Sequence, residues 1–127
     1  SGLRSEPLFL PIVGNFYRGM TVSVPLQKEM FNGRVSIKAV HEVLSTAYEP
    51  RSNIKVLELN DNEQLENGFL NPHVVKGTDR LEIFVYGHDD QMVLISRLDN
   101  LGKGASGAAT QNLNLMLGFP EYKGLAL

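Results

Sequence analysis

The sequence contains no cysteine among its 127 residues. That absence excludes disulfide bonds, thiolate metal sites and cysteine nucleophiles within the chain at the same time. A domain of this length buries roughly two thirds of the surface that its unfolded chain exposes, so we expect it to fold without a covalent or metal cross-link. Any chemistry that needs a thiolate must come from outside these residues.

Long apolar runs and an excess of positive charge are also missing. The longest apolar stretches, such as Leu8 to Val13, are far shorter than the roughly 20 residues of a membrane-spanning helix, and no charged segment followed by an apolar one opens the chain. The formal net charge of -2 provides no basic field for a nucleic acid backbone. We therefore expect a soluble, cytoplasmic protein that binds neither membranes nor nucleic acid.

The composition, with 43% hydrophobic and 20% charged residues, is typical of one globular domain over residues 1–127. Alternating apolar and polar residues from Gly19 to Leu26 predict a half-buried strand that Pro25 closes. Between Ser36 and Tyr48, apolar residues recur with the spacing of one helix face. This pattern predicts a helix with Ser36 as its N-cap, in which Ile37, Val40 and Leu44 are buried.

The second half of the chain predicts a β-hairpin followed by a helix. Residues 80–86 and 91–98 favour strands and flank the turn sequence Gly87-His88-Asp89-Asp90. The other predicted elements are an extended segment at 8–13, a short strand at 53–59, a loop at 60–72 and a helix at 104–117. The order β-β-α-β-β-β-α predicts an α+β domain with a mixed, largely antiparallel sheet and helices on one face.

Residues 102–107 (GKGASG) match the G-x-G-x-x-G pattern of dinucleotide-binding folds. A Rossmann unit needs a second parallel strand after its helix and an acidic residue about 20 positions on. The chain ends at Leu127, which leaves no room for that crossover. We therefore exclude a self-contained dinucleotide-binding fold. The glycines allow either a tight turn into a closely packed helix or the close approach of a ligand to the backbone.

Three sequence blocks resemble one enzyme family. The longest runs from Arg97 to Gly107 and continues through residues 111–118 (QNLNLMLG), the second runs from Phe9 to Met20, and the third from Val75 to Asp79. Together they resemble the C-terminal half of N-acetyl-γ-glutamyl-phosphate reductases, with Asp79 where that family usually has asparagine. The implied fold is that of the C-terminal domain of semialdehyde and glyceraldehyde-phosphate dehydrogenases.

This resemblance implies part of an enzyme. Such reductases convert N-acetyl-γ-glutamyl phosphate to the semialdehyde with NADPH in arginine biosynthesis, through a cysteine thioester formed with loss of phosphate. Their cysteine lies in an N-terminal Rossmann domain, which is absent here, so we expect the chain alone to be inactive. Arg18 would bind an anionic group of the substrate. The residues expected near the nicotinamide end of NADP are Asn100, Lys103, Gly104, Gln111 and Asn112.

The identity of the acid/base group is open. The family commonly has a histidine after the proline of the first segment, whereas Ile12 follows Pro11 here, and isoleucine cannot transfer a proton. Another group, the missing half or a shifted register would account for this departure. We expect His41, His73 and His88 to be structural or solvated, with His73 the best functional candidate among them.

Two other functions fit the sequence. A non-catalytic interaction module of the same fold is supported by Ile12 and by the absence of cysteine. Half of an aspartate-semialdehyde dehydrogenase would share the fold and a related Asn-x-x-Lys-Gly segment, although the stretch from Gly14 to Gly19 favours the acetylglutamyl enzyme.

Assembly and domain docking can also be predicted. The strand at residues 81–86 carries apolar side chains on both faces while few helices are available to cover them, which predicts a homo-oligomer, specifically a dimer through the sheet. We further expect the segment from Asn100 to Gln111 to face the cleft where the cofactor domain docks, as a helix start suited to an anion, with Ala105, Ala108 and Ala109 uncovered.

Overall fold

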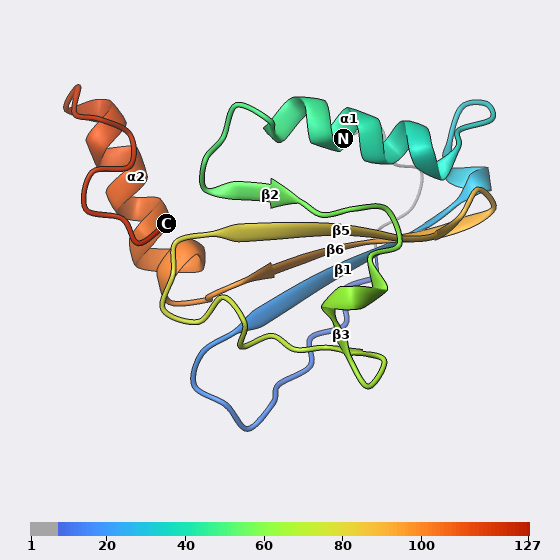
Figure 1. Cartoon of the computed structure of the whole chain (residues 1–127), viewed down its shortest axis with the longest axis horizontal. Coiled ribbons are helices and arrows are strands. Elements are labelled where there is room, and N and C mark those ends of the chain that lie inside the picture. The colour runs from blue at the N-terminus through green and yellow to red at the C-terminus, as the bar shows by residue number, and fades with distance from the viewer. Residues whose placement is uncertain (1–7) are drawn as a thin grey trace.

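The computed structural model describes residues 8–127 and consists of a four-stranded mixed sheet, a small two-stranded sheet and two α-helices (Figure 1). The main sheet has the order β1-β6-β5-β2, in which β1 and β5 pair antiparallel with β6, and β2 pairs parallel with β5. This confirms the predicted α+β class with a mixed, largely antiparallel sheet. The elements are β1 (Met20–Gln27), η1 (Lys28–Met30), α1 (Ile37–Tyr48), β2 (Ile54–Val56), η2 (Asn62–Gln64), β3 (Leu65–Glu66), β4 (Phe69–Leu70), β5 (Leu81–His88), β6 (Gln91–Leu98), η3 (Gly102–Ser106) and α2 (Gly107–Met116).

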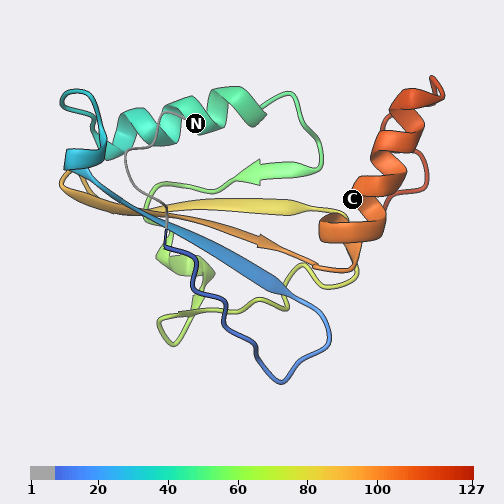
Figure 2. The same ribbon diagram turned by 180° about the vertical axis from the view of Figure 1, so that it is seen from behind.

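Helix α1 lies along one face of the sheet (Figures 1 and 2). Its predicted N-cap is confirmed, because Ser36 Oγ accepts a hydrogen bond from the Ala39 amide at 3.2 Å. Ile37 is buried, while Val40 and Leu44 are half-buried and pack against the same core cluster. The apolar face of this helix therefore forms the core with the sheet, although only its first residue is completely enclosed.

Strand β1 forms one edge of the sheet and is longer than predicted. The expectation that Pro25 closes it was wrong, since the strand continues to Gln27. Lys28 donates its amide to the Asp90 carbonyl, so by alternation Leu26 also turns its amide toward β6 while Pro25 faces the open edge. Proline is tolerated there because no ladder bond is lost. The strand is also more exposed than the half-buried strand that was predicted, because only the Leu26 side chain is partly covered.

The β5–β6 hairpin is confirmed, but its turn is shorter than the four predicted residues. Strand β5 extends to His88, which pairs with Gln91, so only Asp89 and Asp90 connect the strands. The Asn60 side chain bonds the Gly87 backbone at both its amide and its carbonyl, at 2.8 and 3.2 Å. These bonds fix the end of β5 against the chain that follows β2.

The opposite face of β5 and β6 is covered by the segment of residues 61–76. Part of this segment, predicted as loop, forms η2 and the β3–β4 pair. Buried Arg97 holds it, donating to Glu82 within the sheet, to the Asn71 carbonyl at 3.1 Å and to Gln64 Oε1 at 3.3 Å. Its guanidinium also lies 5.0 Å from the Phe84 ring centroid. A single buried cation thus anchors this long connection to the sheet.

Helix α2 follows the end of β6 and lies beyond the end of the sheet (Figures 1 and 2). It begins as a single π-helical segment, η3, where the α-helix was predicted to start. A Cβ atom added to Gly102 would lie 2.6 Å from the Thr78 carbonyl oxygen, and one on Gly107 would overlap the Asp79 carboxylate. At these two positions glycine permits close packing of the helix start against the turn before β5.

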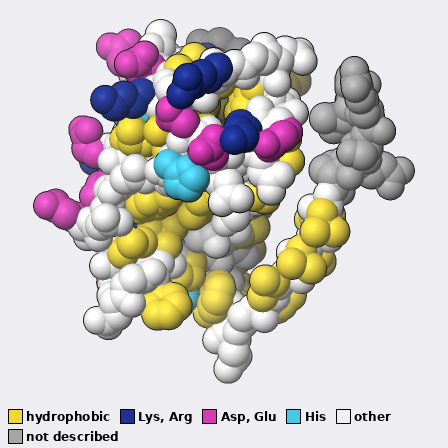
Figure 3. Space-filling view, turned by 90° about the vertical axis from the view of Figure 1, so that its right-hand side faces the viewer, with side chains coloured by type: hydrophobic (Ala, Val, Ile, Leu, Met, Phe, Trp, Pro, Cys, Tyr) yellow, Lys and Arg dark blue, Asp and Glu magenta, His cyan; other side chains and the backbone are white. Residues whose placement is uncertain are grey.

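Among residues 8–127, no helix is long and apolar enough to cross a bilayer. The predicted extended segment at 8–13 forms no strand, and its apolar side chains are almost fully exposed. Figure 3 shows hydrophobic side chains along this arm, apart from the body of the molecule.

Candidate functional site

The candidate site lies where β1 begins and β6 ends, since Met20 pairs with Leu98. This pairing brings the residues before β1 next to those after β6. Arg18 Nη1 lies 3.5 Å from Asp99 Oδ2, and the Gly19 amide donates to Asn100 Oδ1 at 2.9 Å. Two of the predicted site residues, Arg18 and Asn100, are therefore neighbours in space although 82 positions separate them.

Asp99 is the buried charge of this site. Its carboxylate accepts hydrogen bonds from the amides of Gly77 at 2.6 Å, Leu101 at 2.8 Å and Gly102 at 3.0 Å. Burial by itself raises the pKa of Asp99, but these amides and the Arg18 guanidinium outweigh it and lower the pKa below its ordinary value. Asp99 is therefore ionised at neutral pH and balances the charge of Arg18.

A second group of side chains surrounds Gln111 on α2. Lys103 Nζ donates to Gln111 Oε1 at 2.8 Å, and Gln111 Nε2 donates to Glu121 Oε1 at 2.7 Å. Glu121 also pairs with Arg51 at 3.2 Å, and Asn53 Nδ2 reaches Gln111 Oε1 at 3.3 Å. The Lys103 ammonium is thus held by a hydrogen-bond network that joins η3, α2, the C-terminal segment and the α1–β2 connection.

The remaining predicted cofactor residues are exposed. Asn112 lies on the open side of α2, and a Cβ on Gly104 would meet no atom closer than 3.2 Å. Ala105 and Ala109 are exposed and Ala108 is half-buried. The predicted set therefore divides into Asn100 beside Arg18, the Lys103–Gln111 pair, and an uncovered surface on the η3–α2 segment.

Sequence reasoning missed three residues that organise this region: Asp99, Asn53 and Glu121. Asp99 lies inside the longest block of resemblance, but an acidic residue that follows a strand is also typical of an ordinary turn, so it gave no signal of a functional role. Glu121 follows the end of α2, and its return to Gln111 leaves no mark in the local sequence.

The three histidines lie in different environments. His41 Nε2 is 2.8 Å from the Leu57 carbonyl oxygen, a contact that joins α1 to the chain after β2. His88 is exposed at the end of β5. His73 packs edge-on against Phe16, with ring centroids 4.9 Å apart. It therefore contacts the segment that carries Arg18, whereas Ile12, at the family's usual histidine position, is exposed.

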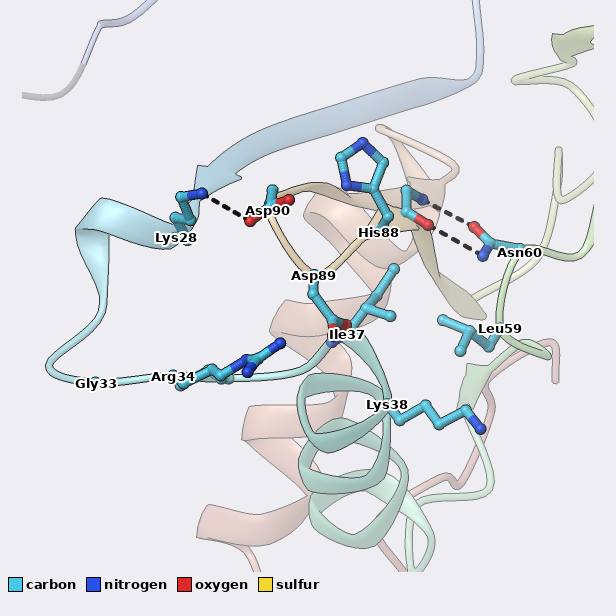
Figure 4. A pocket seen from close by; sticks show the side chains of 12 residues that line it. Lys28, Gly33, Arg34, Ile37, Lys38, Leu59, Asn60, His88, Asp89 and Asp90 are labelled. Atoms are coloured by element: carbon cyan, nitrogen blue, oxygen red, sulfur yellow. Dashed lines mark hydrogen bonds and ion pairs between the residues drawn. The ribbon is translucent and has the colours of Figure 1, made fainter.

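A pocket of about 860 Å³ lies elsewhere, between the start of α1 and the β5–β6 turn (Figure 4). Its rim carries Lys28, which pairs with Asp90 at 2.8 Å, as well as Arg34 and Lys38. This pocket is at the far end of β1 from Arg18, and the eight residues of that strand alone span about 25 Å at roughly 3.3 Å per residue. It contains none of the predicted site residues. Within the described part of the chain, no cluster of three or more His, Asp or Glu side chains could hold a metal ion.

Sequence comparison identifies the family. The profile described as semialdehyde dehydrogenase, dimerisation domain, matches residues 1–100. This chain belongs to that family. The predicted resemblance to the C-terminal part of semialdehyde-forming reductases is confirmed.

Curated relatives of this dimerisation domain carry one enzyme name. N-acetyl-gamma-glutamyl-phosphate reductase 2 of Nostoc sp. is 44% identical over 128 residues, covering 98% of this chain and 40% of that protein. The N-acetyl-gamma-glutamyl-phosphate reductase of Trichormus variabilis gives the same identity and coverage. The protein of that name from Brucella ovis is 42% identical, covering 91% of this chain and 37% of its own length. The chain spans about two fifths of the length of these relatives and matches their C-terminal part.

Proposed function

We propose that this dimerisation domain is the C-terminal part of an NADPH-dependent N-acetyl-γ-glutamyl-phosphate reductase, which reduces the acyl phosphate to the semialdehyde in arginine biosynthesis. The observation that carries the proposal is the 42–44% identity to reductases of that name over almost the whole chain. Because the chain has no cysteine, the thioester-forming nucleophile lies in the remaining part of such an enzyme, and the chain alone is inactive.

The substrate's anionic group binds Arg18 in this proposal. The Arg18 side chain keeps 37% of its surface exposed, and a single ion-pair contact to Asp99 leaves other guanidinium N–H groups available. Those donors suit a carboxylate or phosphate oxygen pair. Because Asp99 is buried and ionised, the guanidinium is held in place before substrate arrives.

In this proposal the cofactor contacts this domain only at the η3–α2 segment. NADPH supplies a hydride when bound, and the η3–α2 segment offers it the Lys103 ammonium, the exposed backbone at Gly104 and the exposed Asn112 amide. These groups fit contact with part of a dinucleotide, but they form no cradle for its adenine half. The cofactor is therefore held mainly by the part of the enzyme outside this chain.

Calorimetry and mutagenesis test this assignment. The 127-residue chain should bind NADPH with no detectable tight phase, and Lys103→Ala in the full-length enzyme should lower activity about 10- to 100-fold, as expected for loss of one charge-assisted hydrogen bond. Lys38→Ala, on α1 beside the pocket at the other end of β1, is the matched control and should retain activity. Tight NADPH binding by the chain, or full activity of Lys103→Ala, would overturn the assignment.

A non-catalytic module of the same fold is the second candidate, favoured by Ile12 in place of the usual histidine and by the absence of cysteine. The gene's upstream sequence separates the two. An upstream strand followed by G-x-G-x-x-G and a later cysteine would refute the module.

We also propose that the domain forms a homodimer through the face of the sheet that α1 only partly covers. By register, Met20, Val22 and Val24 share a face with Leu26, which packs against the α1 core cluster. These three side chains are 37%, 46% and 47% exposed. The open edge itself is a poor interface, because Pro25 has no amide to donate there. A second copy packed on this face would cover the apolar stripe.

A further inference from the structure

Two adjacent residues at the end of β6 hold both the side chain and the backbone at Arg18. Asp99 Oδ2 lies 3.5 Å from Arg18 Nη1, and Asn100 Oδ1 accepts the Gly19 amide at 2.9 Å. We propose that Asp99 and Asn100 are positioning residues, a clamp that sets where the Arg18 guanidinium meets the anionic group of the substrate. This inference rests on the substrate-binding role proposed above for Arg18.

The Asp99 carboxylate is a fixed anchor. It has no exposed surface, and three backbone amides hold it from two separate segments, Gly77 before β5 and Leu101 and Gly102 after β6. A buried carboxylate held in this way cannot follow a mobile arginine, so the arginine must adopt the position that the carboxylate defines. The hydrogen bond from the Gly19 amide to the Asn100 side chain then fixes the backbone next to Arg18 and so limits the direction in which the Arg18 side chain projects.

The clamp also leaves the guanidinium free to bind. At 3.5 Å and through one nitrogen, the Arg18–Asp99 contact is longer than a charge-assisted bond of about 2.8 Å and is not bidentate. Arg18 is therefore oriented by its counter-ion without using the donors that a substrate oxyanion needs.

The same carboxylate connects the substrate side to the cofactor side. Its Oδ1 accepts the Leu101 and Gly102 amides, which begin the turn into η3, and Lys103 follows immediately. Arg18 and Lys103 are thus placed relative to one buried group. Loss of Asp99 should displace the guanidinium first, because the turn also keeps its backbone bond from the Gly104 amide to the Asp99 carbonyl.

A double-mutant cycle in the full-length enzyme tests the clamp. Arg18→Ala should raise KM for the acyl phosphate about 10- to 100-fold. Asp99→Asn should raise KM about tenfold with a smaller effect on kcat, because the neutral side-chain amide of asparagine cannot form an ion pair with the Arg18 guanidinium. In the Arg18→Ala background, Asp99→Asn should change KM no further. Asp90→Asn, which removes a carboxylate from an exposed ion pair at the far end of β1, is the control and should leave KM unchanged.

A second pair of variants covers the case in which Asp99→Asn does not fold. Asn100→Ala removes the acceptor for the Gly19 amide and should raise KM severalfold, while Asn100→Asp restores an acceptor and should recover most of it. If Arg18→Ala leaves KM unchanged, the proposed role of Arg18 fails. If Arg18→Ala raises KM but Asp99→Asn and Asn100→Ala do not, or if their effects multiply with that of Arg18→Ala, only the clamp is overturned.

Discussion

Replacing Gly107 with alanine should destabilise the domain by about 2 kcal/mol. The new methyl group would overlap the Asp79 carboxylate and lie 2.9 Å from the Gly102 carbonyl oxygen, and such overpacking costs about 1–3 kcal/mol. Asp79 also bonds the Ala126 backbone at both amide and carbonyl, so its displacement forfeits about 1 kcal/mol for each bond broken. Alanine recovers about 1 kcal/mol in helix propensity, which leaves a net loss.

Urea and thermal unfolding followed by circular dichroism measure this loss. At roughly 3–5 °C per kcal/mol for a domain of this size, Tm should fall by about 8 °C. Gly104→Ala is the matched control in the same segment, because the nearest atoms to its Cβ, Leu98 Cδ1 at 3.2 Å and the Asp99 carbonyl oxygen at 3.3 Å, would need to shift by only a few tenths of an ångström. It should change Tm by no more than a few degrees.

The Asp79→Ala background isolates the cause. With the carboxylate removed, Gly107→Ala should cost close to nothing, since the gain in helix propensity then offsets the remaining contact with the Gly102 carbonyl. An equal loss of stability in both backgrounds would refute the packing argument and would point to the π-helical backbone as the reason for glycine.

Two further predictions concern charge and assembly. The pKa of Asp99 is lowered in the folded state, so its contribution to stability is complete above the unfolded value near 3.9 and is lost as pH falls through the folded one. The free energy of unfolding should therefore decline more steeply below about pH 4 in the wild type than in Asp99→Asn, and parallel curves between pH 6 and pH 3 would contradict this. For assembly, light scattering at micromolar concentration should show a dimer that Val22→Lys with Val24→Lys dissociates, whereas Thr21→Lys with Ser23→Lys, on the other face of β1, does not. A wild-type monomer, or dissociation only by the second pair, would reject the proposed interface.

Local patterns in the sequence predicted the elements whose signals are local. The Ser36 cap, the face of α1 and the β5–β6 hairpin depend on residues a few positions apart, and all three are present. Pro25 misled the prediction because its effect depends on which side of the strand is paired. That pairing is set by β6, more than 60 residues later, and no local pattern carries it.

The candidate site was predicted only through family resemblance. Arg18 and Asn100 were named separately, and nothing in the sequence showed that they meet. The glycines allowed two interpretations, and the structure supports close packing at Gly102 and Gly107, whereas Gly104 is exposed and would give a Cβ longer contacts of 3.2–3.3 Å. Asp99 was missed because its importance comes from complete burial and from an amide donated by distant Gly77.

The position of Pro25 on the open edge has a consequence for the newly made chain. A single copy of the chain displays an eight-residue edge strand, β1, which could template the addition of further strands and lead to fibrous aggregates. Pro25, the sixth residue of that strand, interrupts any such ladder because it has no amide to donate at the open edge. In the proposed dimer, Pro25 therefore hinders association through the strand edge while leaving the apolar face of β1 available to a second copy.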